Sequence, residues 1–246
     1  MSENVQVGLR TNQLLYGSLF SGIGGFDLGF DRAGLKCAWQ VEIDPFARAV
    51  LQKHWPEVPK HDDVKTFEPT PVDVVCGGFP CQDISSSGKR NGLDGERSGL
   101  FYEFSRVIRT IRPRFVVMEN VADLVVRGLP RVLGELAEIG YDAEWHCIPA
   151  ADFGLPQGRD RIWIVANTHG KRCEASEERD STRAIISKRP NDDGLVEAQH
   201  RARDVAPRKC RVAHGVSRGM DRVRACGNAV VPAIAEWIGR RLIESV

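Results

Sequence analysis

Short apolar runs alternate with longer amphipathic stretches along the first two thirds of the chain. The short runs cover residues 14–20, 37–42, 72–76, 115–118, 141–148 and 159–166, and such runs are typical of strands buried in a parallel sheet. Between them, apolar residues at helical spacing predict helices over 26–33, 44–55, 100–112 and 130–139. Strands that alternate with helices favour an α/β fold, a mostly parallel sheet with helices on both faces.

The pattern changes between Thr168 and Arg224, where apolar residues become sparse. This segment holds 14 Lys and Arg against 9 Asp and Glu, whereas the whole chain carries a net charge of only +1. A basic segment on an otherwise acidic domain is typical of a surface that faces nucleic acid, although charge runs are usually solvated surface. We therefore expect an α/β domain over 1–167, a small basic segment over 168–224, and a C-terminal helix within 225–246.

Composition places the chain among ordinary globular proteins. It has 246 residues, of which 42% are hydrophobic and 27% charged, enough for one large domain. Seven cysteines without a Cys-x-x-Cys pair argue against a disulfide framework or structural zinc. With no signal-peptide pattern and no apolar run long enough for a membrane span, we expect a cytoplasmic protein without a bound metal.

Two strand ends carry groups suited to a nucleoside ligand. The first strand runs directly into the glycine turn Ser21–Gly25, and the second ends at Glu42. A glycine turn brings backbone N–H groups to a ligand, and an acid about 20 residues later can accept from ribose hydroxyls. The turn does not have the G-x-G-x-x-G spacing, and each feature alone is a weak signal.

A third strand end carries a candidate nucleophile. Cys81 follows Gly77-Gly78-Phe79-Pro80, and the proline holds it on a stiff turn at the edge where α/β sheets bind ligands. A lone cysteine here would normally be an inert thiol. Its context favours a nucleophile, because Glu119 and Asn120 end the next strand, and Arg159 and Arg161 share one face of a later one.

Taken in order, these segments resemble the cytosine-5 DNA methyltransferase family, in a short bacterial or phage form with a reduced target-recognition region. The resemblance lies in Leu19–Phe26, Glu42, Gly78–Gln82, Arg97–Phe101, Glu119–Val121, Gln157–Arg161 and Gly227–Val230. It implies a Rossmann-like, S-adenosyl-L-methionine-dependent methyltransferase fold. In this fold, 1–167 would be the catalytic and cofactor-binding domain, 168–224 a reduced target-recognition segment, and 225–246 a C-terminal helix that folds back onto the catalytic domain. It also implies a DNA (cytosine-5-)-methyltransferase that adds a methyl group to carbon 5 of a flipped cytosine in duplex DNA, in DNA modification and restriction protection.

The resemblance assigns four catalytic residues. Cys81 would attack carbon 6 of the cytosine, and Arg159 would favour its thiolate form. Glu119 would hold the ring nitrogen and exocyclic amine, and Arg161 would contact the carbonyl oxygen. Asn120 would order the loop around Pro80.

The family pattern also assigns binding residues. Those expected to bind S-adenosyl-L-methionine are Phe20, Ser21, Gly22, Ile23, Gly24, Gly25, Glu42, Ile43, Asp63, Val64, Gly78, Pro80, Leu100, Asn228 and Val230. Asp63 could alternatively cap a turn. The residues expected to contact DNA lie in the polar loop after Cys81 and in the basic segment: Gln82, Ser85, Lys89, Arg90, Arg97, Arg218, Arg222 and Arg224, with His214 as a further candidate.

The chain departs from the family pattern in two places. Ser18 stands where the family usually has an acid, and the 57 residues of 168–224 are few for a target-recognition domain. A reduced module, loose specificity or a specificity partner would each account for the short segment, and we favour the reduced module. We expect a monomer that acts on duplex DNA, with a cognate restriction nuclease as a further candidate partner. A tRNA cytosine-5 methyltransferase, a non-catalytic nucleic-acid-binding regulator and a purely structural module remain open as alternatives.

Overall fold

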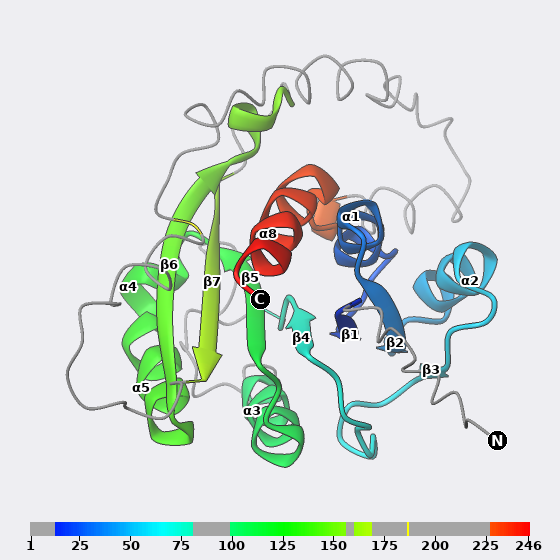
Figure 1. Ribbon diagram of the computed structural model, residues 1–246, viewed down its shortest axis with the longest axis horizontal. Coiled ribbons are helices and arrows are strands. Elements are labelled where there is room, and N and C mark those ends of the chain that lie inside the picture. Colours follow the sequence, from blue (N-terminus) through cyan, green and yellow to red (C-terminus); the bar gives the residue numbers. More distant parts are fainter. Residues whose placement is uncertain (1–12, 81–98, 156–159, 169–185, 187–226) are drawn as a thin grey trace, which may run out of the picture.

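The computed structural model describes residues 13–80, 99–155, 160–168, 186 and 227–246. Its strands form one sheet (Figure 1) in the order β3 (Lys60–His61), β2 (Lys36–Val41), β1 (Leu15–Leu19), β4 (Val74–Gly77), β5 (Phe115–Val121), β7 (Asp160–Thr168) and β6 (Tyr141–Pro149). Neighbouring strands from β3 to β5 are parallel, and β7 runs antiparallel to both β5 and β6. The prediction of a mostly parallel sheet is confirmed, with β7 as the exception.

Helices cover both faces of this sheet, as predicted. On one face, α1 (Gly25–Ala33) and α8 (Pro232–Glu244) pack over residues such as Val74 and Val117. On the other face, Val75 and Val116 lie under α3 (Leu100–Ile111), α4 (Leu124–Arg127) and α5 (Leu129–Ile139). Successive residues of a strand thus belong alternately to the two apolar clusters, and for this reason the strand sequences are continuously hydrophobic.

Three short elements were not expected from the sequence. These are β3, the helix α4 and the 3-10 turn η2 (Ala150–Phe153). β3 has only two residues, which are too few to show a strand pattern in the sequence.

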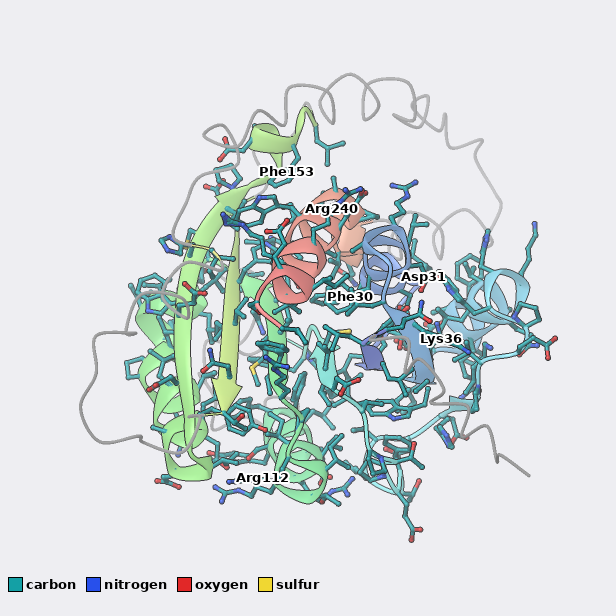
Figure 2. The ribbon with its side chains drawn as sticks, in the orientation of Figure 1. Phe30, Asp31, Lys36, Arg112, Phe153 and Arg240 are labelled. Carbon is teal, nitrogen blue, oxygen red and sulfur yellow. The ribbon has the colours of Figure 1, made fainter. Side chains whose placement is uncertain are left out.

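The helices α1 and α8 lie side by side, although about 200 residues of chain separate them. Gly29 makes this contact possible, because a Cβ atom there would lie 2.5 Å from Ala235 Cβ and 2.5 Å from the Pro232 carbonyl oxygen. Phe30 extends from α1 towards the sheet, and Asp31 lies on the side of α1 towards α2 (Figure 2). The C-terminal helix thus packs directly on the helix that follows the first strand.

The helix α2 (Pro45–His54) begins as its sequence predicts. The Asp44 side chain accepts hydrogen bonds from the N–H groups of Phe46 at 2.8 Å and Ala47 at 3.1 Å, and Pro45 occupies the first helical position. An acid that caps two free N–H groups stabilises the start of a helix. The helix predicted over 44–55 is confirmed, with Asp44 as its N-cap.

A buried carboxylate lies where α1 meets β1 and β2. Asp27 is fully buried and accepts hydrogen bonds from Gln40 Nε2 at 2.8 Å, Ser18 Oγ at 3.3 Å and Cys37 Sγ at 3.7 Å. These donors are all neutral, and burial raises the pKa of Asp27 to about 6. Gln40 Oε1 is buried without a hydrogen-bond partner among the described residues.

Candidate active site

A cleft of about 420 Å³ opens at the edge of the sheet where β1, β2, β4 and β5 end. Open α/β sheets bind their ligands at this edge, and the volume falls in the range of small-molecule sites. Of the residues predicted to bind a cofactor, those that line the cleft are Phe20, Ser21, Gly22, Ile23, Glu42, Ile43, Asp63, Val64, Gly78, Pro80, Leu100, Asn228 and Val230. The cleft is also lined by Glu119 and Arg161, so one space joins the predicted cofactor and catalytic residues.

Gly24 and Gly25 were also predicted to bind the cofactor, but they are not among the described residues that line the cleft. Gly24 faces Trp55, whose ring would lie 2.5 Å from a Cβ atom at Gly24. Gly25 faces Val230, whose carbonyl oxygen would lie 2.5 Å from a Cβ atom. These two glycines allow close packing on the side of the turn away from the cleft, while Ser21, Gly22 and Ile23 line the cleft.

Phe20 adopts a backbone conformation that is rare for its residue type. Its φ of 53° lies in the left-handed region, and bulky residues held there are found mainly where structure or function over-determines them. The Phe20 ring stacks on Phe104 with 6.4 Å between centroids. The strained backbone turns the chain out of β1 and places Phe20 in the wall of the cleft.

Glu42 connects the glycine turn to the start of α2. Its Oε2 accepts from the Gly22 N–H at 2.7 Å, and its Oε1 accepts from the Asp44 N–H at 2.8 Å. Each carboxylate oxygen can accept more than one hydrogen bond, so these contacts leave capacity for ligand hydroxyl groups. The two hydrogen bonds fix the carboxylate on the wall of the cleft.

The far end of the cleft combines apolar and polar groups. The Ile43 side chain is 69% exposed, an unusual condition for an isoleucine, while Val64 is buried. Asp63 Oδ1 accepts from the Lys65 N–H at 2.9 Å, which agrees with the turn-capping alternative for Asp63. An exposed apolar side chain on a cleft wall is available to cover a flat ring.

The cleft also contains a close ion pair. Arg161 Nε lies 2.8 Å from Glu119 Oε1, and Glu119 is 7% exposed. The antiparallel register of β5 and β7 pairs Val121 with Arg161, so Arg161 and Glu119 are diagonal neighbours on adjacent strands. The reversed direction of β7 is therefore what brings Arg161 to the glutamate.

Two neighbouring contacts fix the chain that leads to Cys81. A Cβ atom at Gly78 would lie 2.9 Å from Glu119 Oε2, so glycine leaves room for the carboxylate. Asn120 Nδ2 donates a hydrogen bond of 3.1 Å to the Phe79 carbonyl oxygen. Both contacts hold the Gly78–Pro80 segment against the end of β5.

Several predicted residues lie outside the part of the chain that the structure describes. They are Cys81 and Arg159 of the catalytic set, and Gln82, Ser85, Lys89, Arg90, Arg97, His214, Arg218, Arg222 and Arg224 of the DNA-binding set. Their assigned roles stay predictions. Cys81 follows Pro80 directly, and Pro80 lines the cleft.

The cleft also contains residues that sequence reasoning did not assign to it, including Asp44, Phe46, Asp62 and Ala229. Asp44 and Phe46 follow Glu42 closely in the chain, and their only sequence signal was the helix start. Among the described residues, no group of three or more His, Cys, Asp or Glu side chains is arranged to hold a metal ion. None of the helices in the described ranges combines the length and apolar character needed to cross a membrane.

Comparison with known sequences gives a consistent result. The model of the C-5 cytosine-specific DNA methylase family matches residues 15–209. Type II methyltransferase M.AquIA of Picosynechococcus is 37% identical over 178 residues, which cover 63% of this chain and 72% of the relative. M2.BsuMI of Bacillus subtilis is 38% identical over 159 residues, covering 61% of this chain and 41% of the relative. M.HhaI of Haemophilus parahaemolyticus is 35% identical over 153 residues, covering 60% and 47%.

Solved structures share the fold. One is described as a DNA modification methyltransferase encoded within an E. coli prophage, with a TM-score of 0.54 and 26% identity over 63% of this chain and 47% of that chain. A DNMT2 mutant of Spodoptera frugiperda has a TM-score of 0.55 and 20% identity, over 68% and 54%. This chain thus spans about half the length of these structures and of the relatives M2.BsuMI and M.HhaI.

Proposed function

Because the chain belongs to the C-5 cytosine-specific DNA methylase family, we propose that it is a DNA (cytosine-5-)-methyltransferase that uses S-adenosyl-L-methionine. This proposal rests on one observation. Glu42 and the glycine turn line the same cleft as the Glu119–Arg161 pair. Methyl transfer requires a donor and an acceptor in contact, and a shared cleft provides that proximity.

The residues of the cleft fit the chemistry of the cofactor. Glu42 is held by two backbone N–H groups and retains lone pairs for the ribose hydroxyls. Phe20, Ile43 and Leu100 line the cleft and supply the apolar surface that an adenine ring needs. The cofactor, when bound, supplies an electrophilic methyl group.

The acceptor is activated by covalent catalysis. Carbon 5 of cytosine is a poor nucleophile, and bond formation between the Cys81 sulfur and carbon 6 makes carbon 5 enamine-like. A free cysteine has a pKa of about 8.5, and a nearby cation increases the thiolate fraction, which is the role of Arg159. Asn120 contributes by fixing the Phe79 carbonyl oxygen, and so the chain that carries Cys81. Carbon 5 would then take the methyl group, and the cofactor sulfur would keep the electrons of the bond that breaks. Loss of the carbon 5 proton to a base, with cleavage of the bond between carbon 6 and the Cys81 sulfur, would release 5-methylcytosine and the thiolate.

Glu119 and Arg161 bind the target base. As the sulfur–carbon bond forms, negative charge develops on the ring. Glu119, which takes up a proton once the base has replaced Arg161 beside it, donates that proton to ring nitrogen 3 while accepting from the exocyclic amine. Arg161 donates to the carbonyl oxygen of the cytosine. Because the two side chains form an ion pair at 2.8 Å, the incoming base exchanges this contact for its own hydrogen bonds.

The target base must leave the DNA duplex to reach this cleft. Gln82, Ser85, Lys89, Arg90 and Arg97 follow Cys81 in sequence and would contact the DNA around the extruded base. Arg218, Arg222 and Arg224 would contact the duplex farther away. We propose that the protein acts as a monomer in the cytoplasm of a bacterial or phage-infected cell, where methylation protects DNA from a restriction nuclease.

The experiment is methyl transfer from tritiated S-adenosyl-L-methionine to mixed-sequence duplex DNA or to tRNA. Cys81→Ser tests the nucleophile, and Cys147→Ser is the matched control, because Cys147 is an exposed thiol on β6. We expect label in DNA with the wild type and Cys147→Ser, and none with Cys81→Ser. Label in tRNA alone would move the substrate to RNA. No label in either, with cofactor binding intact, would overturn the enzymatic proposal.

A further inference from the structure

The strands β6 and β7 form one side of the sheet, and apolar side chains of β7 lie on the same face of the sheet as α1 and α8. Glu144 of β6 is the register partner of Val165 of β7, and register partners point to the same side of a sheet. Val165 and Trp163 belong to the apolar cluster of the α1–α8 face, whereas Ile162 and Ile164 belong to the opposite cluster. Val165 is only 2% exposed, so other residues cover it on this face of the sheet.

Ile186 contributes to the cover of this face. It is the one residue between 169 and 226 that the structure describes. Its side chain is 3% exposed and belongs to the same cluster as Val165. Its backbone N–H donates a hydrogen bond of 3.2 Å to Glu144 Oε1.

We propose that Ile186 is an anchor that docks the chain between β7 and α8 onto β6, and that this docking sets the position from which the basic residues of that chain reach DNA. The two contacts differ in kind. The buried side chain supplies an apolar driving force, and the Glu144 hydrogen bond fixes the backbone of one particular residue. The DNA part of the proposal rests on the proposed function.

The sequence around Ile186 explains why this residue serves as the anchor. Ile185 and Ile186 interrupt a stretch that is otherwise mainly polar and charged, with Arg183 on one side and Lys188 on the other. The anchor divides the connection from β7 to α8 into residues 169–185 and 187–226. The basic run from Arg201 to Arg224 lies in the second part. A point of attachment between two chain ends reduces the number of conformations that are open to a connection.

Limited trypsin digestion tests the anchor without any assay of activity. Trypsin can cut after Arg183 and after Lys188, the basic residues that flank Ile186 most closely. Protein segments that are docked must open before a protease can cut them. We expect Ile186→Ser and Glu144→Ala to be cut at these two bonds about fivefold faster than the wild type, or more.

Two further variants separate the anchor from general damage. Glu144→Gln keeps a side-chain oxygen that can accept from the Ile186 N–H, so its cleavage should match the wild type. His146→Ala changes an exposed residue two positions along the same strand and should also leave cleavage unchanged. Equal cleavage after Arg183 and Lys188 in the wild type and in Ile186→Ser would overturn the anchor.

The role in DNA binding is tested with the same variants. Dissociation constants are measured for a mixed-sequence duplex and, separately, for S-adenosyl-L-methionine. We expect Ile186→Ser and Glu144→Ala to bind the duplex several-fold more weakly while cofactor affinity is unchanged. Unchanged duplex affinity, together with faster cleavage, would overturn the role in DNA positioning. A wild type that binds no DNA would instead count against the proposed function, and the digestion result would still decide whether the anchor exists.

Discussion

The buried carboxylate of Asp27 predicts an unusual dependence of stability on pH. Asp27 has no exposed surface, and its hydrogen-bond donors Gln40, Ser18 and Cys37 are neutral. Burial raises its pKa from 3.8 to about 6. Between these two values the folded protein holds this proton more tightly than the unfolded chain does. The stability from this group is therefore fully present below pH 3.8 and is lost as the pH rises through about 6.

The size of the effect follows from the two pKa values. A tenfold difference in proton affinity corresponds to about 1.4 kcal/mol, so this difference amounts to about 3 kcal/mol. Asp27→Asn removes the ionisation and keeps the shape of the side chain. The new amide can donate to Gln40 Oε1, which lacks a partner among the described residues, once the Gln40 amide turns over. We therefore expect the substituted side chain and Gln40 to keep one hydrogen bond between them.

The assay is urea unfolding of wild type and Asp27→Asn at about pH 4.5 and about pH 7.5, followed by far-ultraviolet circular dichroism. Other carboxyl groups titrate alike in both proteins, so their effects cancel in the difference between them. From about pH 4.5 to about pH 7.5, the unfolding free energy of Asp27→Asn relative to the wild type should rise by about 2 kcal/mol. This is less than the full effect, because part of the titration lies below the lower pH. Glu57→Gln, on an exposed loop, is the matched control and should show no such change.

A pH-independent difference between wild type and Asp27→Asn would refute this reasoning. It would mean that the folded protein accommodates the charged carboxylate as easily as water does. If the unfolding free energies of Asp27→Asn and Glu57→Gln changed equally between the two pH values, the same conclusion would follow. In either case burial among neutral donors would not be the factor that determines the proton affinity of Asp27.

Three further substitutions test local geometry. Asp44→Ala removes the cap of α2 and should lower the unfolding free energy by about 1 kcal/mol, with Asp44→Ser retaining most of it; equal urea midpoints for all three proteins would contradict the capping role. Gly29→Val forces a side chain against Ala235 and should cost about 1–3 kcal/mol in the same assay, and an unchanged midpoint would argue against the close α1–α8 contact. Asn120→Ala removes the donor to the Phe79 carbonyl oxygen. It should slow methyl transfer about tenfold or more with cofactor affinity retained, and a full rate would exclude the positioning role.

The sequence predicted most strands and helices, because buried strands and amphipathic helices have distinct apolar patterns. It did not predict the direction of β7, because an apolar run carries no information about strand direction. The length of the connection between β6 and β7 could have indicated this direction. Only residues 150–159 separate β6 from β7, fewer than the dozen or more residues that a parallel crossover usually needs.

Recognition of the cleft from sequence succeeded where short motifs define backbone turns. The Ser21–Gly25 turn and Glu42 meet as predicted, because parallel strands end at a common edge. Asp27 and Ile186 were not identified. Nothing in the spacing of α1 distinguishes a buried acid from a solvated one, and Ile186 contacts Glu144 from 42 positions away. Contacts of that kind depend on tertiary structure and have no local signal.

The contact between α1 and α8 has a consequence for the order of folding during synthesis. Val230 packs against the glycine turn at Gly25, and α8 covers α1. These partners are about 200 residues apart in the chain, and native contacts over such separations form late. A growing chain on the ribosome can pair β1, β2 and β4 early, but it cannot close the cleft until Asn228, Val230 and α8 have emerged. Fragments that stop before residue 227 should thus accumulate as ligand-incompetent intermediates, which a separately supplied C-terminal peptide could complete.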